Sequence, residues 1–143
     1  MRNFGIIDAN VLLRVFLNDI PEQTTASADT LDQMRRGLAV GTVLTTVVQE
    51  IVYILERQYR VERSFVASAI RGIADVPNLG IENRQQILDC LTDYELRPGI
   101  SFSDAFHCAM ARSFHDGAIV SFDRKLSSVP GIARREPGEF AKA

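Results

Sequence analysis

Short apolar runs alternate with longer segments of helical periodicity along this chain, and the alternation limits the folds open to it. The apolar runs cover residues 4–7, 43–45 and 118–121, with a weaker one at 131–133. Helical spacing of apolar side chains extends over residues 22–36, 46–59, 62–74, 83–96 and 101–115. Strands separated by helices predict right-handed crossovers and parallel pairing. We therefore expect an α/β fold with a mainly parallel central sheet of about four to five strands and helices on both faces.

Length and composition indicate one globular domain. The chain has 143 residues, of which 46% are hydrophobic and 24% charged, as in ordinary globular proteins. We expect a single domain over residues 1–143, with a frayed, charge-rich tail at about 136–143. The net charge of −2 argues against binding nucleic acid through general phosphate neutralisation. Any attraction to RNA must come from a few local cations or from bound metal ions.

The chain shows no targeting or membrane signal. Asp8 interrupts the first apolar run, so a signal peptide is not predicted. No apolar stretch approaches the roughly 18 residues of a membrane span. Cys90 and Cys108 lie in helical segments and form no C-x-x-C pattern, which favours buried, reduced thiols. These features predict a cytoplasmic protein that does not contact membranes.

Four acidic side chains stand where this fold would bring ligands. Asp8 ends the first apolar run and Asp123 follows the run at 118–121. Because ligands bind beyond the carboxyl ends of parallel strands, we expect both at the same edge of the sheet. Glu50 and Asp104 lie on predicted helices that flank it. Carboxylates gathered there would repel one another unless cations held them together, and oxygen ligands suit Mg²⁺ or Mn²⁺ rather than Zn²⁺.

Each acid also has a purely structural interpretation. Asp8 could cap the helix that follows it, and Asp123 could cap a turn over residues 124–127. Asp104 could belong to a capping box begun by Ser101. Glu50 could be a solvated residue at the border of an apolar helical face. The joint pattern, rather than any single acid, leads us to the hypothesis of a metal site.

Other chemistries have weaker support. Zinc binding by His107, Cys108 and His115 is disfavoured, because Cys108 and His115 share one helical row, His107 is offset, and no second ligand pair follows. Phosphate-cradling glycine loops and a serine-nucleophile elbow are absent from the sequence. A phosphoacceptor signalling domain would need an acid near residues 43–45, where none occurs. A haloacid-dehalogenase-like phosphatase would need an acid at position 10, where Asn10 stands.

The four acidic segments, in order, resemble those of PIN-domain ribonucleases, and more narrowly the VapC-type toxins of toxin–antitoxin operons. The resemblance covers residues 4 to about 135. It is carried by Ile7-Asp8-Ala9-Asn10 with Arg14, by the stretch 45–55 around Glu50, by Phe102-Ser103-Asp104-Ala105, and by Ser121-Phe122-Asp123-Arg124. Two departures stand out: Ser121 replaces the usual Thr, and Phe106-His107-Cys108 replaces a more aliphatic stretch.

The resemblance implies a metal-dependent endoribonuclease. Asp8, Asp104 and Asp123 would hold Mg²⁺ or Mn²⁺, and Glu50 would ligate a second ion or orient the attacking water. Two side chains are expected to hold the carboxylates in place: Asn10 and Ser121. Three cations are candidates for contacts with RNA phosphates: Arg14, Arg57 and Arg124.

The resemblance also implies partners. Toxins of this kind act on RNA, typically form homodimers, and are silenced by a cognate antitoxin protein. Two alternatives remain open from the sequence. One is a PIN-domain nuclease that processes RNA outside any toxin–antitoxin system, and the other is a non-catalytic module that binds RNA or protein.

Overall fold

The computed structural model describes residues 3–141, so the last two residues of the expected frayed tail lie outside the described part. Within that part it contains six α-helices, one 3-10 helix and five strands. The chain divides into two compact units, Met1–Arg84 and Gln85–Ala143. Across the described residues, no helix has the length and apolar character needed to cross a membrane. The predicted α/β class and the parallel pairing of its strands are confirmed.

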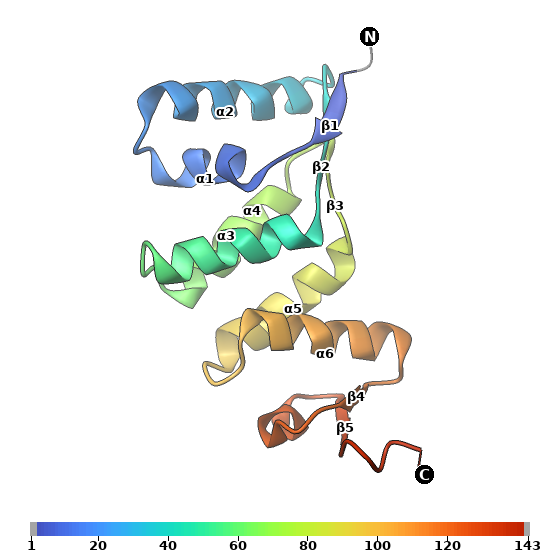
Figure 1. Cartoon of the computed structure of the whole chain (residues 1–143). Coiled ribbons are helices and arrows are strands. Elements are labelled where there is room, and N and C mark those ends of the chain that lie inside the picture. The colour runs from blue at the N-terminus through green and yellow to red at the C-terminus, as the bar shows by residue number, and fades with distance from the viewer. Residues whose placement is uncertain (1–2, 142–143) are drawn as a thin grey trace. The chain divides into compact units, whose positions relative to one another are not determined.

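The first unit is built on a three-stranded parallel sheet in the order β1 (Phe4–Ile6), β2 (Val40–Val43) and β3 (Leu79–Ile81). Figure 1 shows the three strands side by side. Gly5 is paired with Gly41, and Gly41 is paired with Leu79. Two helices separate each strand from the next, as parallel pairing requires. Asp8 follows β1 by two residues, at the carboxyl end of the sheet.

Four helices of this unit lie along one side of its sheet (Figure 1). They are α1 (Ala9–Leu17), α2 (Pro21–Arg35), α3 (Thr45–Arg57) and α4 (Arg63–Ala74). The broad apolar face predicted for α3 is buried, through Val47, Val48, Ile51, Val52 and Leu55. In the strands, Val43, Leu79 and Ile81 are buried, whereas Phe4, Ile6 and Val40 are exposed. Within this unit, the four helices therefore pack on the face of the sheet that carries Val43, Leu79 and Ile81.

The predicted boundary of the second strand is wrong by about three residues. We expected residues 43–45, but β2 ends at Val43 and α3 begins at Thr45. Glu82 explains the early helix start, because its carboxylate accepts a hydrogen bond from the Thr45 N–H at 3.0 Å. Capping from a residue so distant in sequence leaves no local signal. Gly41 also lowers the strand propensity of this segment, so the sequence pattern around it does not indicate a strand.

The second unit contains α5 (Arg84–Leu96, whose first residue closes the first unit), α6 (Phe102–Phe114), β4 (Ala118–Val120), the 3-10 helix η1 (Arg124–Ser128) and β5 (Ala133–Arg135). Strands β4 and β5 form their own parallel pair, with Ala118 opposite Ala133. The five strands thus belong to two ladders rather than to one continuous sheet. The final strand lies two residues later than the predicted 131–133.

Aromatic packing and a tight turn order the second unit. The rings of Tyr94 on α5 and Phe102 on α6 meet edge to face, with centroids 5.7 Å apart. Gly117 has a positive φ of 80° and links α6 to β4. A Cβ at this position would lie 1.9 Å from the carbonyl oxygen of Gly131. Only glycine therefore allows the chain to turn so closely into β4.

Candidate active site

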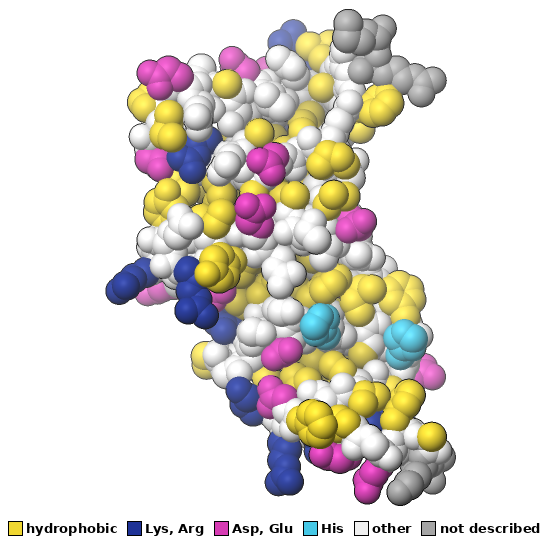
Figure 2. Space-filling view, viewed as in Figure 1, with side chains coloured by type: hydrophobic (Ala, Val, Ile, Leu, Met, Phe, Trp, Pro, Cys, Tyr) yellow, Lys and Arg dark blue, Asp and Glu magenta, His cyan; other side chains and the backbone are white. Residues whose placement is uncertain are grey.

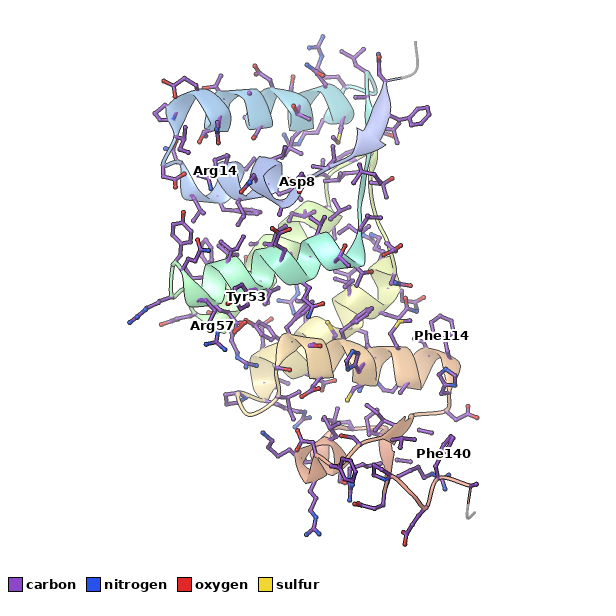
Figure 3. The ribbon with its side chains drawn as sticks, viewed as in Figure 1. Asp8, Arg14, Tyr53, Arg57, Phe114 and Phe140 are labelled. Atoms are coloured by element: carbon purple, nitrogen blue, oxygen red, sulfur yellow. The ribbon has the colours of Figure 1, made fainter. Side chains whose placement is uncertain are left out.

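Asp8 occupies the N-cap position of α1 without capping it. Its backbone is extended, with φ −77° and ψ 158°, yet its side chain makes no capping hydrogen bond. Figure 3 shows Asp8 at the start of α1. The residue is exposed, so its carboxylate is available to a ligand. The structural interpretation of Asp8 as a side-chain cap does not hold.

Glu50 lies on the exposed side of α3. Tyr53 and Arg57 follow it at positions i+3 and i+7, on the same side of the helix. The guanidinium carbon of Arg57 lies 5.9 Å from the centroid of the Tyr53 ring (Figure 3), a distance at which a cation is attracted to an aromatic face. This side of α3 therefore combines a carboxylate, an aromatic ring and a cation.

Asp104 stands in the first turn of α6, and Ser101 caps that helix. The Ser101 hydroxyl accepts a hydrogen bond from the Asp104 N–H at 3.1 Å. Among the described residues, the Asp104 carboxylate makes no reciprocal bond, so only half of the expected capping box forms. The Asp104 side chain is half-buried, and its carboxylate oxygens remain available to bind a ligand.

Asp123 forms two local hydrogen bonds, one through its side chain and one through its backbone. One of its oxygens accepts from the N–H of Lys125 at 3.0 Å and caps η1. Its own N–H donates to the hydroxyl of Ser121 at 3.0 Å. Arg134 in turn donates to the Ser121 carbonyl at 2.6 Å. Ser121 thus holds the Asp123 backbone, and its hydroxyl makes no direct hydrogen bond to a carboxylate within the described residues.

Asp104 and Ser121 line one cavity of the second unit, which has a volume of about 320 Å³. Two histidines, His107 and His115, line it as well. The remaining lining is mostly apolar, from Met110, Ala111, Ala118, Ile119, Val120 and Leu126. The structure therefore brings together two of the predicted site residues within this unit, at a concave surface.

The four acids divide equally between the two units, Asp8 and Glu50 in the first and Asp104 and Asp123 in the second. Within residues 3–141, no three His, Cys, Asp or Glu side chains form a group that could hold a metal ion. The donor chemistry nevertheless fits a hard divalent ion, because three of the four carboxylates have no hydrogen-bond partner in the described chain. Binding of one ion by acids of both units stays a prediction.

The predicted phosphate-binding arginines differ in their surroundings. Arg14 is paired with Asp19, and only 11% of its side chain is exposed. Burial acts to raise the pKa of Asp19, but hydrogen bonds, first from Tyr59, and the Arg14 charge together lower it. Arg14 therefore fits a structural contact better than a substrate contact. By contrast, Arg57 and Arg124 are exposed and form no ion pair within the described chain.

Asn10 is exposed in the first turn of α1. In the part of the chain that the structure describes, its side chain makes no hydrogen bond to Asp8. The expected role in holding the carboxylate is therefore not visible as a direct contact.

An ion-pair network that we did not predict holds the second unit together. Arg112 on α6 donates to Asp89 and to Asp93 on α5, each at 2.9 Å, and to the Pro130 carbonyl at 3.0 Å. Burial acts to lower the pKa of Arg112, but the two aspartates outweigh it and raise that pKa. The sequence feature that could have indicated this network is the spacing of Asp89 and Asp93, which lie four residues apart on one side of α5.

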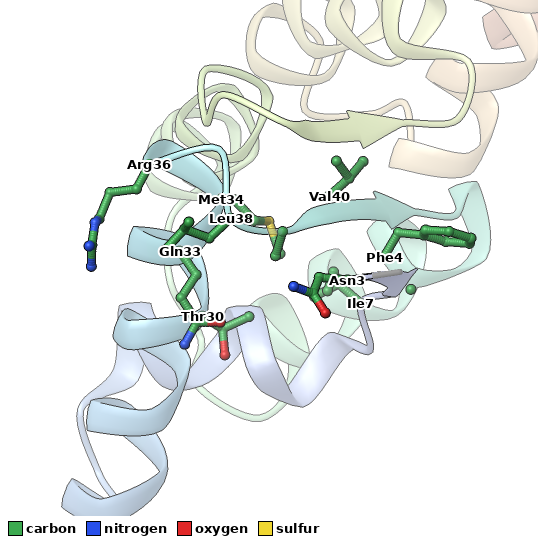
Figure 4. Close-up of a pocket in the computed structure, with 11 residues that line it drawn as sticks. Asn3, Phe4, Ile7, Thr30, Gln33, Met34, Arg36, Leu38 and Val40 are labelled. Carbon is green, nitrogen blue, oxygen red and sulfur yellow. The ribbon is translucent and has the colours of Figure 1, made fainter. Parts of the chain in front are cut away.

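A second cavity, of about 570 Å³, lies in the first unit beside β1, β2 and the end of α2 (Figure 4). Its lining includes Phe4, Met34 and Leu38, with Arg36 as the one charged side chain. No carboxylate lines it, so it offers no ligand set for hydrolytic chemistry. The candidate active site is therefore formed by the acidic residues and not by this larger cavity.

Comparison with known protein families finds one family model that matches most of the chain. A family model described as PIN domain matches residues 6–132. The matched segment contains all four acids and spans both compact units. No curated protein matches the chain.

Proposed function

The chain belongs to the PIN domain family, and on that premise we propose that it is an Mg²⁺- or Mn²⁺-dependent endoribonuclease. PIN domains are generally metal-dependent nucleases, so a nuclease-type function follows from the family. We propose further that residues 1–143 act as one PIN domain, that the protein is a VapC-like toxin, and that it works in the cytoplasm.

The observation that carries the catalytic proposal is the state of the Asp8 carboxylate. Asp is among the best N-cap residues, and the backbone of Asp8 has the conformation that capping needs. Nevertheless, the carboxylate is exposed and has no hydrogen-bond partner among residues 3–141, at the carboxyl end of a parallel strand, where ligands of such sheets bind. An acid kept free in this position supports a ligand-binding role over a structural one.

The proposed roles follow from the donors that each residue presents. Asp8, Asp104 and Asp123 would bind the ion, which supplies Lewis-acid chemistry when bound. Glu50 would orient the attacking water, because its exposed carboxylate can accept a proton from it. Ser121 fixes the backbone at Asp123 and so positions the third carboxylate. Arg57 and Arg124 would attract RNA phosphates, since neither is neutralised by a described partner.

The toxin proposal includes an antitoxin partner and a homodimer. The apolar, exposed side chains of the sheet in the first unit support a protein partner, because Phe4, Ile6 and Val40 are more than half exposed. The rival proposals are an RNA-processing PIN nuclease and a non-catalytic binding module. Growth arrest on expression in a bacterial host, lost in Asp8→Asn, favours the toxin over both rivals.

The decisive experiment is cleavage of total RNA by the purified protein with Mg²⁺ and with excess chelator. We expect Asp8→Asn and Asp104→Asn each to lower the cleavage rate roughly 100-fold or more, as removal of a key electrostatic group does in other enzymes. Asp29→Asn, an exposed acid on α2, is the matched control and should cleave normally. Undiminished cleavage in chelator, or in both active-site variants, would overturn the proposal.

A further inference from the structure

The cavity beside Asp104 has a composition that suits a flat, uncharged ligand. Its apolar wall comes from α6 and β4, and its polar groups are Asp104, His107, His115 and Ser121. At about 320 Å³ it lies at the lower end of the size range of small-ligand sites. All of its lining residues belong to the second unit, so the cavity is complete within that unit.

Both histidines of the chain line this cavity together with Asp104. His107 follows Asp104 by three residues on α6, His115 is the C-cap residue of that helix, and all three line the same cavity. Both imidazoles are exposed. The two histidines of the chain are visible in cyan, near hydrophobic side chains, on the face shown in Figure 2. Any molecule in the cavity would therefore contact an imidazole close to the Asp104 carboxylate.

The charge of the lining does not suit a phosphate group. The lining contains no Lys or Arg, whereas a phosphate in a pocket needs a cation or several N–H donors. An uncharged planar ring fits better, because RNA bases that are splayed out of a strand stack on aromatic side chains, histidine included.

We infer that this cavity binds one nucleobase of the RNA substrate, and that His107 determines which nucleotide is preferred beside the cleaved bond. The inference rests on the proposed ribonuclease function. A base in the cavity lies against the apolar wall and stacks on the His107 ring. Its ribose and phosphate then face the end of α6 that carries Asp104. This assigns a function to His107, which stands where the resembled family has a more aliphatic stretch.

The test compares cleavage of a single-stranded RNA pool with a randomised segment by wild type, His107→Ala and His107→Phe. Loss of one stacking contact should raise KM roughly fivefold or more and flatten the preference at one nucleotide position. His107→Phe keeps a ring for stacking and should recover most of the affinity. Phe114→Ala is the matched control, because Phe114 is an exposed aromatic on the same helix (Figure 3) and does not line the cavity.

Binding separates this inference from the catalytic proposal. In the Asp8→Asn background, fluorescence anisotropy of a labelled single-stranded RNA oligonucleotide measures affinity without cleavage, and His107→Ala should weaken it by the same factor. If wild type cleaves RNA while His107→Ala keeps both its KM and its nucleotide preference, the inference is wrong and the ribonuclease proposal stands. If wild type cleaves no RNA, the catalytic proposal fails. The cavity inference is then supported if His107→Ala weakens RNA binding in the anisotropy measurement, and is wrong if the affinity is unchanged.

Discussion

Gly41 occupies the middle strand of the three-stranded sheet at a point where no side chain fits. A Cβ at this position would lie 2.7 Å from Cγ1 of Ile7, 2.8 Å from Cε of Met34 and 3.0 Å from Cδ1 of Leu79. Ile7 directly precedes Asp8, so a displacement of Ile7 reaches the candidate active site. We expect Gly41→Ala to destabilise the protein and to lower its activity.

Gly80 on the neighbouring strand provides the matched comparison. A Cβ there would meet only the Gly41 carbonyl oxygen, at 3.8 Å, an ordinary contact. Both substitutions reduce the conformational freedom of the unfolded chain, and this stabilises the folded state by about 0.4–1 kcal/mol. Only Gly41→Ala adds the cost of overpacking, about 1–3 kcal/mol. Subtracting the two effects therefore isolates the overpacking cost, and Gly41→Ala should be about 1–3 kcal/mol less stable than Gly80→Ala.

Urea unfolding followed by circular dichroism measures both free energies of unfolding. Part of the cost in Gly41→Ala is relieved by movement of Met34, whose flexible end is one of the three crowded atoms. A difference near the lower end of the range would indicate this movement. Equal stabilities of Gly41→Ala and Gly80→Ala would refute the close packing at Gly41 and, with it, the expected effect on Asp8.

Three further predictions concern stability and reactivity. Arg112→Ala should lower the free energy of unfolding by about 1.5–3 kcal/mol, the range for hydrogen bonds between charged groups. The exposed Arg36→Ala should change it by less than about 0.5 kcal/mol, and equal effects would count against the network. Hydrogen bonds, first from the N–H of Thr45, hold the pKa of Glu82 below its ordinary 4.5. Its stabilising effect is thus present above pH 4.5 and lost as pH falls through the folded-state pKa. At neutral pH the melting temperature of the wild type should be higher than that of Glu82→Gln. The difference between the two melting temperatures should disappear in acid, and a difference that stays constant with pH would contradict this. Burial raises the pKa of Cys90 to about 12 and of Cys108 to about 11, so neither should react with a thiol reagent at neutral pH until urea unfolds the chain.

Local patterns predicted most of the helices and the class of the fold. The apolar face of α3 repeats at helical spacing over residues 47–55, and burial follows that face. The second strand was predicted at 43–45 rather than at 40–43, because its exact position depends on partners far along the chain. Glu82 fixes the start of α3 from 37 residues away, and Gly41 is tolerated in a strand because three neighbouring side chains fill its place.

The candidate site was predicted unevenly for the same reason. Motif order singled out Asp8 and Asp104 as candidate ligands, and their role stays a prediction; both carboxylates lack a hydrogen bond within the described residues. The Arg112 network was missed, because its partners, two aspartates on α5 and a carbonyl in a loop, lie outside the helix that carries Arg112. For Ser121, the sequence predicted that it holds a carboxylate in place, but not by which contact. Its hydroxyl holds a backbone N–H, a contact that depends on the local turn and not on the residue type.

The uncapped start of α1 has an evolutionary consequence. A side chain that closed this helix end would add about 1 kcal/mol of stability, and Ser in place of Asp8 could do so at the expense of the ligand oxygen. Selection for thermal resistance alone would therefore favour replacing Asp8, whereas selection for RNA cleavage would retain it. Libraries screened only for melting temperature should drift toward folded, inactive proteins at this position.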